Sequence, residues 1–338
     1  MVTTRDRILL GHGGGGRLSR ELIEAHIAPR FAEGPLRGFP DAARLEIGGA
    51  SLVFTTDSFV VSPKRFPGGD IGDLAVYGTV NDIAVSGGRP LWLSLALICE
   101  EGLPLDELDA VLDSVARAAS RCGVGIATGD TKVVSRGQCD GLYVNTAGVG
   151  EALPGFALGA AGLREGDAVI ASGDLGEHGM AVMAARAGMD LGGRLVSDTG
   201  PVHGLVLAIE DLAPTVRFMR DPTRGGAAST LNEMLGGRGD VGILLRERDL
   251  PFSEGARAVA EVLGVDLLHV ASEGRVLLVC APDAASEVIG RWRRMPEGQG
   301  ARAIGSVTSD IGRVVLETAI GGRRLVDVPQ GELLPRIC

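Results

Sequence analysis

LWLSLALICEEGLPLDELDAVLDSVARAASRCGVGIATGDTKV, residues Leu91–Val133, contains three successive structural signals. The apolar run Leu91–Cys99 predicts a strand. Pro104–Cys122 predicts an amphipathic helix, because its apolar residues recur every three or four positions. Gly125–Thr128 predicts a second strand, which ends at Asp130. A strand, a helix and a strand in succession indicate a mixed α/β architecture.

The same alternation continues on both sides of this stretch. Upstream, Leu52–Thr55 predicts a strand that ends at Asp57, and Ile71–Ser86 predicts a helix. We therefore expect an α+β fold of mixed α/β type. The second half adds predicted strands at Ala168–Ser172, Val241–Leu245, Val276–Cys280 and Ala303–Val307, and predicted helices at Gly179–Ala187, Val202–Leu212 and around Leu231–Leu235.

A change in composition divides the chain. Glu151–Gly162 is rich in Gly, Ala and Pro, which indicates a domain boundary. We assign residues 1–152 to an N-terminal domain and 153–320 to a C-terminal domain. Residues 321–338 contain two prolines and are expected to form an extended, mobile tail.

Composition excludes several classes of protein. The 338 residues are 45% hydrophobic and 22% charged, which is typical of a globular protein with room for two cores. The longest apolar runs are too short for a membrane span. A net charge of −10 and an aromatic content of 4% disfavour nucleic acid as a partner. Five cysteines without CxxC spacing argue against structural zinc and fit a reducing cytoplasm.

Four consecutive glycines near the N-terminus could hold an anion. Gly13, Gly14, Gly15 and Gly16 follow His12 and precede a predicted helix at Arg17–His26. Backbone N–H groups of such a loop can converge on phosphate at a helix N-terminus. The loop lacks the Gly-Lys-Ser/Thr ending of a Walker A motif, so a flexible turn is an equally good interpretation.

Three aspartates from separate segments form a candidate metal site. Asp57 and Asp130 each follow a predicted strand, and Asp82 lies in a helix beside Asn81. Singly, the strand-end residues could be turn residues that bond their own backbone. Together, three carboxylates favour magnesium that bridges to phosphate oxygens. Lys132, two residues after Asp130, could contact phosphate or a substrate carbonyl, although an exposed lysine is the simpler reading.

The second half contributes two further candidates. Arg220-Asp221-Pro222-Thr223-Arg224-Gly225-Gly226 combines anion donors, a carboxylate and a glycine turn, and it could equally be an ordinary helix N-terminus. Glu273, between two apolar runs, is either a catalytic base or a turn acid.

The last residue, Cys338, is a cysteine. A thiol on a mobile end can receive a group in one place and present it in another. Taken alone, an incidental thiol on a frayed terminus is the simpler reading.

These motifs, in this order, resemble the HypE family of carbamoyl dehydratases, which act in nickel–iron hydrogenase maturation. That family belongs to the superfamily of aminoimidazole ribonucleotide synthetase. The Pro-Arg-Ile-Cys ending distinguishes it, whereas the internal motifs are common to the superfamily. The matching segments are His12–Gly16, Thr55–Ser58, Thr79–Ala84, Thr128–Val133, Arg220–Gly226 and Pro335–Cys338.

The resemblance implies a two-domain aminoimidazole ribonucleotide synthetase-like fold with a flexible C-terminal tail, whose N-terminal domain binds ATP and dimerises. It implies that ATP and Mg²⁺ drive dehydration of an S-carbamoyl group on Cys338 to an S-cyanide. A HypF-like carbamoyltransferase would supply the carbamoyl group, and a HypC–HypD complex would receive the cyanide. Glu273 would be the base and Lys132 an orienting partner. The implied nucleotide contacts are Gly13, Gly14, Gly15, Gly16, Asn81, Asp82, Asp130, Thr131, Arg220, Asp221 and Arg224, with Asp57, Asp82 and Asp130 as metal ligands.

Two alternatives remain at this point. Another ATP-dependent synthetase of the superfamily would act on a small molecule and would not need Cys338. A non-catalytic assembly scaffold would use Cys338 to bind metal. A selenophosphate synthetase is disfavoured, because no cysteine lies near Gly13–Gly16.

Overall fold

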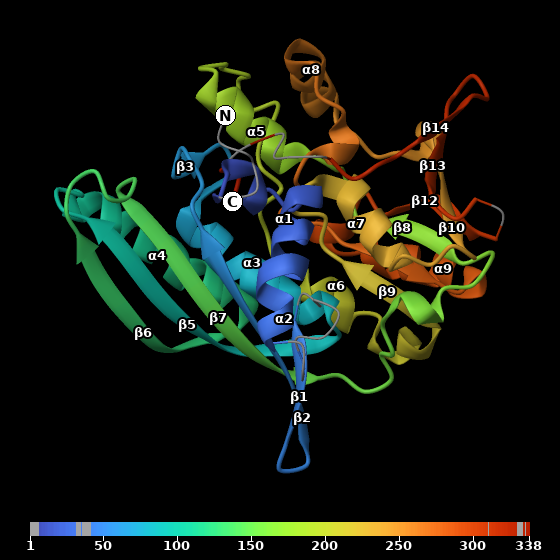
Figure 1. The fold of residues 1–338 in the computed structure, drawn as a ribbon, viewed down its shortest axis with the longest axis horizontal. Coiled ribbons are helices and arrows are strands. Elements are labelled where there is room, and N and C mark those ends of the chain that lie inside the picture. Colours follow the sequence, from blue (N-terminus) through green and yellow to red (C-terminus); the bar gives the residue numbers. More distant parts are fainter. Residues whose placement is uncertain (1–6, 32–34, 36–41, 310, 330–333, 335) are drawn as a thin grey trace.

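The computed structural model describes residues 7–31, 35, 42–309, 311–329, 334 and 336–338, and it confirms a mixed α/β chain built on two large sheets (Figure 1). One sheet lies in the N-terminal half and the other in the C-terminal half. The N-terminal segment contains α1 (Arg17–Leu22), a π-helical turn (Ile23–Ile27) and α2 (Ala28–Phe31).

The N-terminal sheet has the strand order β1-β2-β7-β5-β6. Strands β5 and β6 are parallel and α4 (Leu105–Cys122) connects them, which confirms the strand–helix–strand prediction. Helix α3 (Ile71–Val85) packs on the same sheet and on α4. The strands are β1 (Ala43–Ile47), β2 (Ala50–Phe59), β5 (Gly88–Glu100), β6 (Gly125–Val134) and β7 (Leu142–Ala152), with a separate ribbon of β3 (Arg65–Phe66) and β4 (Gly69–Asp70).

Helix α3 begins at a strong N-cap. The Asp70 carboxylate accepts hydrogen bonds from the backbone of Gly72 at 2.8 Å and of Asp73 at 3.2 Å, and from Ser114 Oγ of α4 at 2.6 Å. Asp70 therefore caps α3 and ties it to α4. Because α3 is buried on nearly all sides, the residues it presents to the site have fixed positions.

The C-terminal sheet has the order β14-β13-β10-β12-β8-β11-β9. Helix α7 packs on one face, over one apolar cluster. Helices α6 and α9 pack on the other face, over a second apolar cluster. The strands are β8 (Ala168–Ala171), β9 (Val216–Arg220), β10 (Gly242–Arg246), β11 (Leu277–Cys280), β12 (Arg302–Thr308), β13 (Val314–Glu317) and β14 (Arg323–Leu325). The helices are α5 (Glu177–Arg186), α6 (His203–Leu207), α7 (Gly226–Leu235), α8 (Glu254–Leu263) and α9 (Pro282–Trp292).

Two strand ends differ from the prediction. β2 runs to Phe59 and β6 to Val134, so Asp57 and Asp130 lie inside strands and do not terminate them. Asp130 lies on exposed strand surface, and Asp57 is partly buried. Across the sheet from Asp57 lie Thr146 of β7 and then Leu95 of β5. Across the sheet from Asp130 lies Ala96, the neighbour of Leu95 on β5. Because directly opposed residues share a face and neighbours along a strand do not, the two aspartates lie on opposite faces of the sheet.

The tail starts later than the sequence suggests. β14 pairs with β13, so residues 323–325 belong to the C-terminal sheet. The part of the tail without sheet pairing follows Leu325, and its residues 330–333 and Pro335 lie outside the described residues.

Candidate active site

Two adjoining cavities lie where the N-terminal and C-terminal halves meet, and Cys338 lines both. The smaller, which we call the acidic pocket, encloses about 160 Å³. The larger, the tail pocket, encloses about 290 Å³. The acidic pocket is lined by Asp57, Asp82, Asp221, Glu273, Arg224 and Cys338, among others, and the tail pocket by Gly13, Gly14, Arg224, His269, Pro329, Ile337 and Cys338, among others.

Glu273 is buried with its carboxyl in the acidic pocket. Its main chain is held from both sides, because the Asp198 carboxylate accepts from Glu273 N–H at 3.0 Å and the Asn81 amide donates to Glu273 C=O at 3.2 Å. Its Oε1 atom has no hydrogen-bond partner among the described residues. Burial, followed by the charges of Asp221, Asp198 and Asp57, raises the pKa of Glu273 well above that of an ordinary glutamate. A carboxyl whose pKa is raised in this way can act as a proton acceptor or donor for a bound group.

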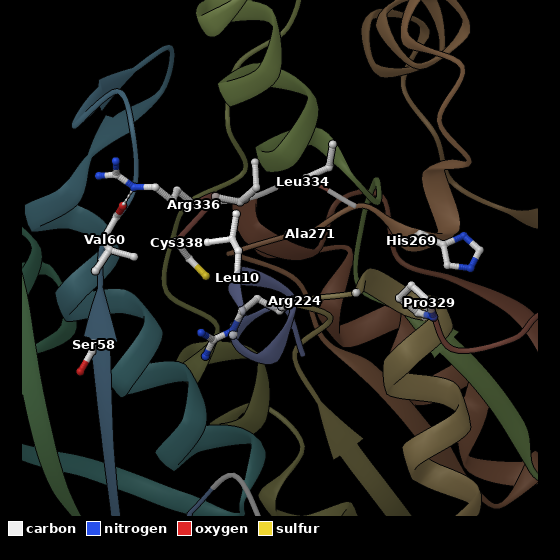
Figure 2. A pocket seen from close by; sticks show the side chains of 14 residues that line it. Leu10, Ser58, Val60, Arg224, His269, Ala271, Pro329, Leu334, Arg336 and Cys338 are labelled. Carbon is white, nitrogen blue, oxygen red and sulfur yellow. Dashed lines mark hydrogen bonds between the residues drawn. The ribbon is translucent and has the colours of Figure 1, made fainter. Parts of the chain in front are cut away.

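Arg224 provides the positive charge between the two cavities. Its guanidinium lies 4.0 Å from the Asp57 carboxylate. Figure 2 shows the sulfur of Cys338 turned toward this guanidinium. The pKa of Arg224 is raised, chiefly by Cys338, with Asp57, Glu273 and Asp82 adding to the effect. A negatively charged group that enters either cavity would meet Arg224.

The glycine loop covers Arg224. Gly15 has φ +71°, and a Cβ built on it would lie 2.8 Å from Arg224 Cβ. A side chain at this position would therefore collide with the arginine. Gly13 and Gly14 line the tail pocket, and Gly16 is the N-cap of α1. The glycine loop, which the sequence predicts as a possible phosphate-binding loop, therefore lies beside the cavities.

The end of the tail is docked along the residues that follow β2. Val60 N–H donates to the backbone oxygen of Cys338 at 3.2 Å, and Ser62 N–H donates to Arg336 C=O at 3.1 Å. Arg336 Nε donates to Val60 C=O at 3.0 Å, and its guanidinium pairs with Asp140 at 2.7 Å. These contacts place Cys338 at the cavities.

A second set of contacts holds the start of the tail. Asn232 of α7 donates to Val326 C=O at 2.8 Å, and His269 Nε2 bonds Asp327 C=O at 3.0 Å. Arg17 N–H donates to Pro329 C=O at 3.2 Å. The tail is therefore held both at 326–329 and at 336–338.

Three of the predicted site residues lie outside this arrangement. Asp130, Thr131 and Lys132 are exposed on the edge strand β6. They are not among the described residues that line the two cavities. Lys132 pairs with Asp130 itself, at 2.8 Å. Because Asp130 and Asp57 lie on opposite faces of the sheet, the predicted set of Asp57, Asp82 and Asp130 is not assembled within one chain. The part of the chain that the structure describes contains no cluster of three or more metal-ligating side chains.

Two other predicted nucleotide contacts have structural partners. Asn81 is fully buried, and besides Glu273 its side chain bonds Gly200 C=O at 3.0 Å and Val202 N–H at 2.8 Å. Arg220 pairs with Glu233 of α7 at 3.1 Å. Asn81 thus joins the two halves and supports the loop that carries Glu273.

The acidic pocket suits magnesium held together with a nucleotide. Asp57, Asp82 and Asp221 line it, and carboxylate oxygens are the ligands that Mg²⁺ prefers. Mg²⁺ commonly uses one or two protein carboxylates and completes its shell with phosphate oxygens and water.

Sequence reasoning missed His178 and the segment Ser197–Val202. His178 is fully buried and contacts the tail through Ile337, and the segment contacts Asn81, His178 and Glu273. These contacts join residues up to 159 positions apart, and no local motif marks them.

Comparisons with known proteins agree with this architecture. Residues 40–152 match the family model "AIR synthase related protein, N-terminal domain", and residues 164–317 match the corresponding C-terminal domain. The carbamoyl dehydratase HypE of Rhodobacter capsulatus is 46% identical, with 100% of both chains covered. HypE of Escherichia coli is 41% identical, over 98% of this chain and 100% of the relative.

Solved structures give the same result. A HypE structure in complex with ATP is 41% identical and has a TM-score of 0.82, covering 98% of this chain and 100% of that chain. A HypE–HypF complex has a TM-score of 0.85 at 41% identity, covering 91% of this chain and 99% of that chain. Among the described residues, none of the helices has the length and apolar character needed to cross a membrane.

Proposed function

Because the chain belongs to the HypE family of carbamoyl dehydratases, we propose that it dehydrates an S-carbamoyl group on its own Cys338 to an S-cyanide, at the expense of ATP. The enzyme is an ATP-dependent carbamoyl dehydratase of hydrogenase maturation. The observation that carries the role of Cys338 is its position: the last residue of the chain lines the same pocket as Glu273, Asp57 and Asp82.

The chemistry follows from the groups in the acidic pocket. Loss of water from S–C(=O)–NH₂ removes the amide oxygen and both nitrogen protons and leaves S–C≡N. ATP supplies a phosphoryl group that makes the oxygen a leaving group, and magnesium held by the pocket carboxylates would neutralise charge on the phosphates. Glu273, whose pKa is raised by burial, takes one nitrogen proton, and the departing phosphate carries away the other. Arg224, beside the thiol, stabilises negative charge on the departing oxygen.

Asp57 and Asp82 would hold magnesium, and Asp221 is the third aspartate of the pocket. Gly13–Gly16 would contact phosphate through backbone N–H groups. Asp221 would then take the role predicted for Asp130 within the chain.

Asp130 and Lys132 would act in a homodimer. They lie on the face of the N-terminal sheet opposite α3, together with Ile98, which pairs with Lys132, and with the exposed Phe54 and Trp92. An exposed apolar surface of this kind fits a second copy of the chain. In such a dimer, the side chains of Asp130 and Lys132 of one protomer would serve the acidic pocket of its partner, and Thr131, whose side chain lies on the other face, would contribute through its backbone.

The remaining partners follow from the reaction. A HypF-like carbamoyltransferase would load Cys338, in keeping with the solved HypE–HypF complex. A HypC–HypD complex would accept the cyanide, and the cytoplasm would supply the ATP and the reduced thiol.

Mass spectrometry of the C-terminal peptide tests the proposal. After incubation with ATP, magnesium and the carbamoyl donor system, we expect a carbamoyl adduct on Cys338 that converts to a cyano adduct only when ATP is present. Absence of both adducts with active partners would refute the proposal. Deletion of Cys338 separates the alternatives: a small-molecule synthetase keeps its activity, and a scaffold loses metal binding without any ATP-dependent adduct.

A further inference from the structure

His178, the second residue of α5, contacts the docked tail from inside the protein. Its Nε2 atom lies 2.9 Å from Ile337 C=O, the carbonyl directly before Cys338. The ring is fully buried and meets Phe66 edge-on, with the centroids 5.2 Å apart. Ile337 is itself buried among residues of the N-terminal core. A polar side chain is thus buried against the tail, and its hydrogen bond ends one residue from the reacting thiol.

The hydrogen bonds define the state of the ring. A carbonyl oxygen can only accept, so Nε2 carries the proton and donates to Ile337. The Nδ1 atom is then an acceptor, and Ser197 Oγ donates to it at 2.7 Å. Ser197 Oγ in turn accepts from Thr199 N–H at 3.0 Å. Burial lowers the pKa of His178, which keeps the ring neutral and preserves this arrangement.

Ser197 begins a segment that also holds the catalytic side of the pocket. The next residue, Asp198, accepts from Glu273 N–H at 3.0 Å. Further along, Gly200 and Val202 bond Asn81, which donates to Glu273 C=O. One short segment therefore contacts both the residue that holds the tail and the residue that would take the proton.

We propose that His178 is a positioning residue: it holds the tail through Ile337 C=O, and Ser197 and Asp198 keep the terminal thiol in register with Glu273. The proposal rests on the proposed function and assigns the side chain that decides whether a loaded Cys338 enters its own pocket productively. His178 does not touch the reacting atoms, and it leaves loading of the tail by another enzyme unaffected.

Two substitutions separate the hydrogen bond from packing. His178→Phe keeps an aromatic ring against Phe66 and removes the donor. His178→Gln keeps an amide donor at the position of Nε2. His203→Phe is the matched control, because His203 is half-buried and lines neither cavity. Ser197→Ala provides a smaller change, which leaves the ring in place and leaves Nδ1 only the longer contact with Thr199 Oγ1 at 3.3 Å.

Alkylation of cysteines in the full-length protein reports docking without any turnover. We expect Cys338 to react about two- to tenfold faster in His178→Phe than in wild type, the range set by loss of one neutral hydrogen bond. His178→Gln should stay within about twofold of wild type, and Ser197→Ala should fall between the two. Cys122 and Cys280 are buried and serve as internal reporters of unfolding. Peptide mass spectrometry resolves each site.

Single-turnover conversion of carbamoylated Cys338 gives the functional readout. His178→Phe should slow this conversion by the same factor by which it speeds alkylation of Cys338. The rate of carbamoylation and the Kd for ATP should be unchanged. Wild-type alkylation of Cys338 in His178→Phe, equal acceleration at Cys122 and Cys280, or failure of glutamine to rescue would each overturn the inference. Lack of any cyano adduct in wild type would instead refute the proposed function, and the alkylation comparison would still decide whether His178 holds the tail.

Discussion

Glu273 places a carboxyl where ionisation is unfavourable, and this affects stability as well as chemistry. Its pKa is raised above the usual 4.5, first by burial. Below pH 4.5 the folded and unfolded states both hold the proton. Above it the folded state binds more protons than the unfolded state, so the contribution of Glu273 to the free energy of unfolding falls as pH rises. The decline is at most about 1.4 kcal/mol per pH unit and stops when the folded carboxyl ionises.

Glu273→Gln should therefore stabilise the protein increasingly as pH rises above 4.5, while cyanation is lost and ATP binding is retained. Urea unfolding between pH 4 and 8, without nucleotide or magnesium, measures the difference from wild type. Glu46→Gln, on the exposed part of β1, is the control. A stability difference that does not change with pH would contradict the raised pKa, and unchanged turnover would remove Glu273 from the mechanism.

Helix α3 depends on one side chain at its start. Asp70 accepts two backbone N–H groups and the hydroxyl of Ser114. Asp70→Ala removes the cap and the closer acceptor of the Ser114 hydroxyl, which keeps only Ala110 C=O at 3.2 Å, so we expect a loss of about 1–3 kcal/mol. Asp106→Ala, in the exposed first turn of α4, should cost less than about 1 kcal/mol. Thermal and urea unfolding compare the two variants, and equal losses would contradict the role of Asp70.

The sequence predicted helices better than it predicted strand ends. The limits of α3 and α4 agree with the prediction, because caps and a repeating apolar pattern are local signals. β6 was predicted too short, because an edge strand with polar residues on an exposed face looks like a turn. A chain read alone also cannot reveal on which face of a sheet Asp130 lies.

The candidate site was predicted where its residues belong to motifs. Asp57, Asp82, Asp221, Arg224, Glu273 and Cys338 all line the acidic pocket. Asn81 proved to support the site from within the core, and His178 could not be predicted. Their roles come from contacts between distant segments, which no spacing in the sequence records.

The dimer proposal predicts complementation between two defective subunits. Asp130→Asn and Glu273→Gln should each abolish most cyanation as homodimers. In a mixed dimer, the Asp130→Asn subunit keeps its own Glu273 and receives Asp130 from its partner. Random mixing at equal amounts should restore about a quarter of wild-type activity, because half of the dimers are mixed and one of their two sites is complete.

Mass spectrometry can identify the modified chain in this experiment. The cyano group should appear on Cys338 of the Asp130→Asn subunit and not on that of the Glu273→Gln subunit. Equal labelling of both chains, or full activity of the Asp130→Asn homodimer, would contradict a role for β6 in the partner's pocket.

The contacts at Val326, Asp327 and Pro329 give the tail a fixed pivot. The nine residues beyond Pro329 reach at most about 30 Å when extended. The thiol is then confined to a small volume around its own pocket, at an effective concentration in the millimolar range. While the dimer stays intact, dilution of the enzyme would not slow its dehydration step, and that step would have no Michaelis constant for the carbamoyl group. ATP would be the only reactant able to saturate it.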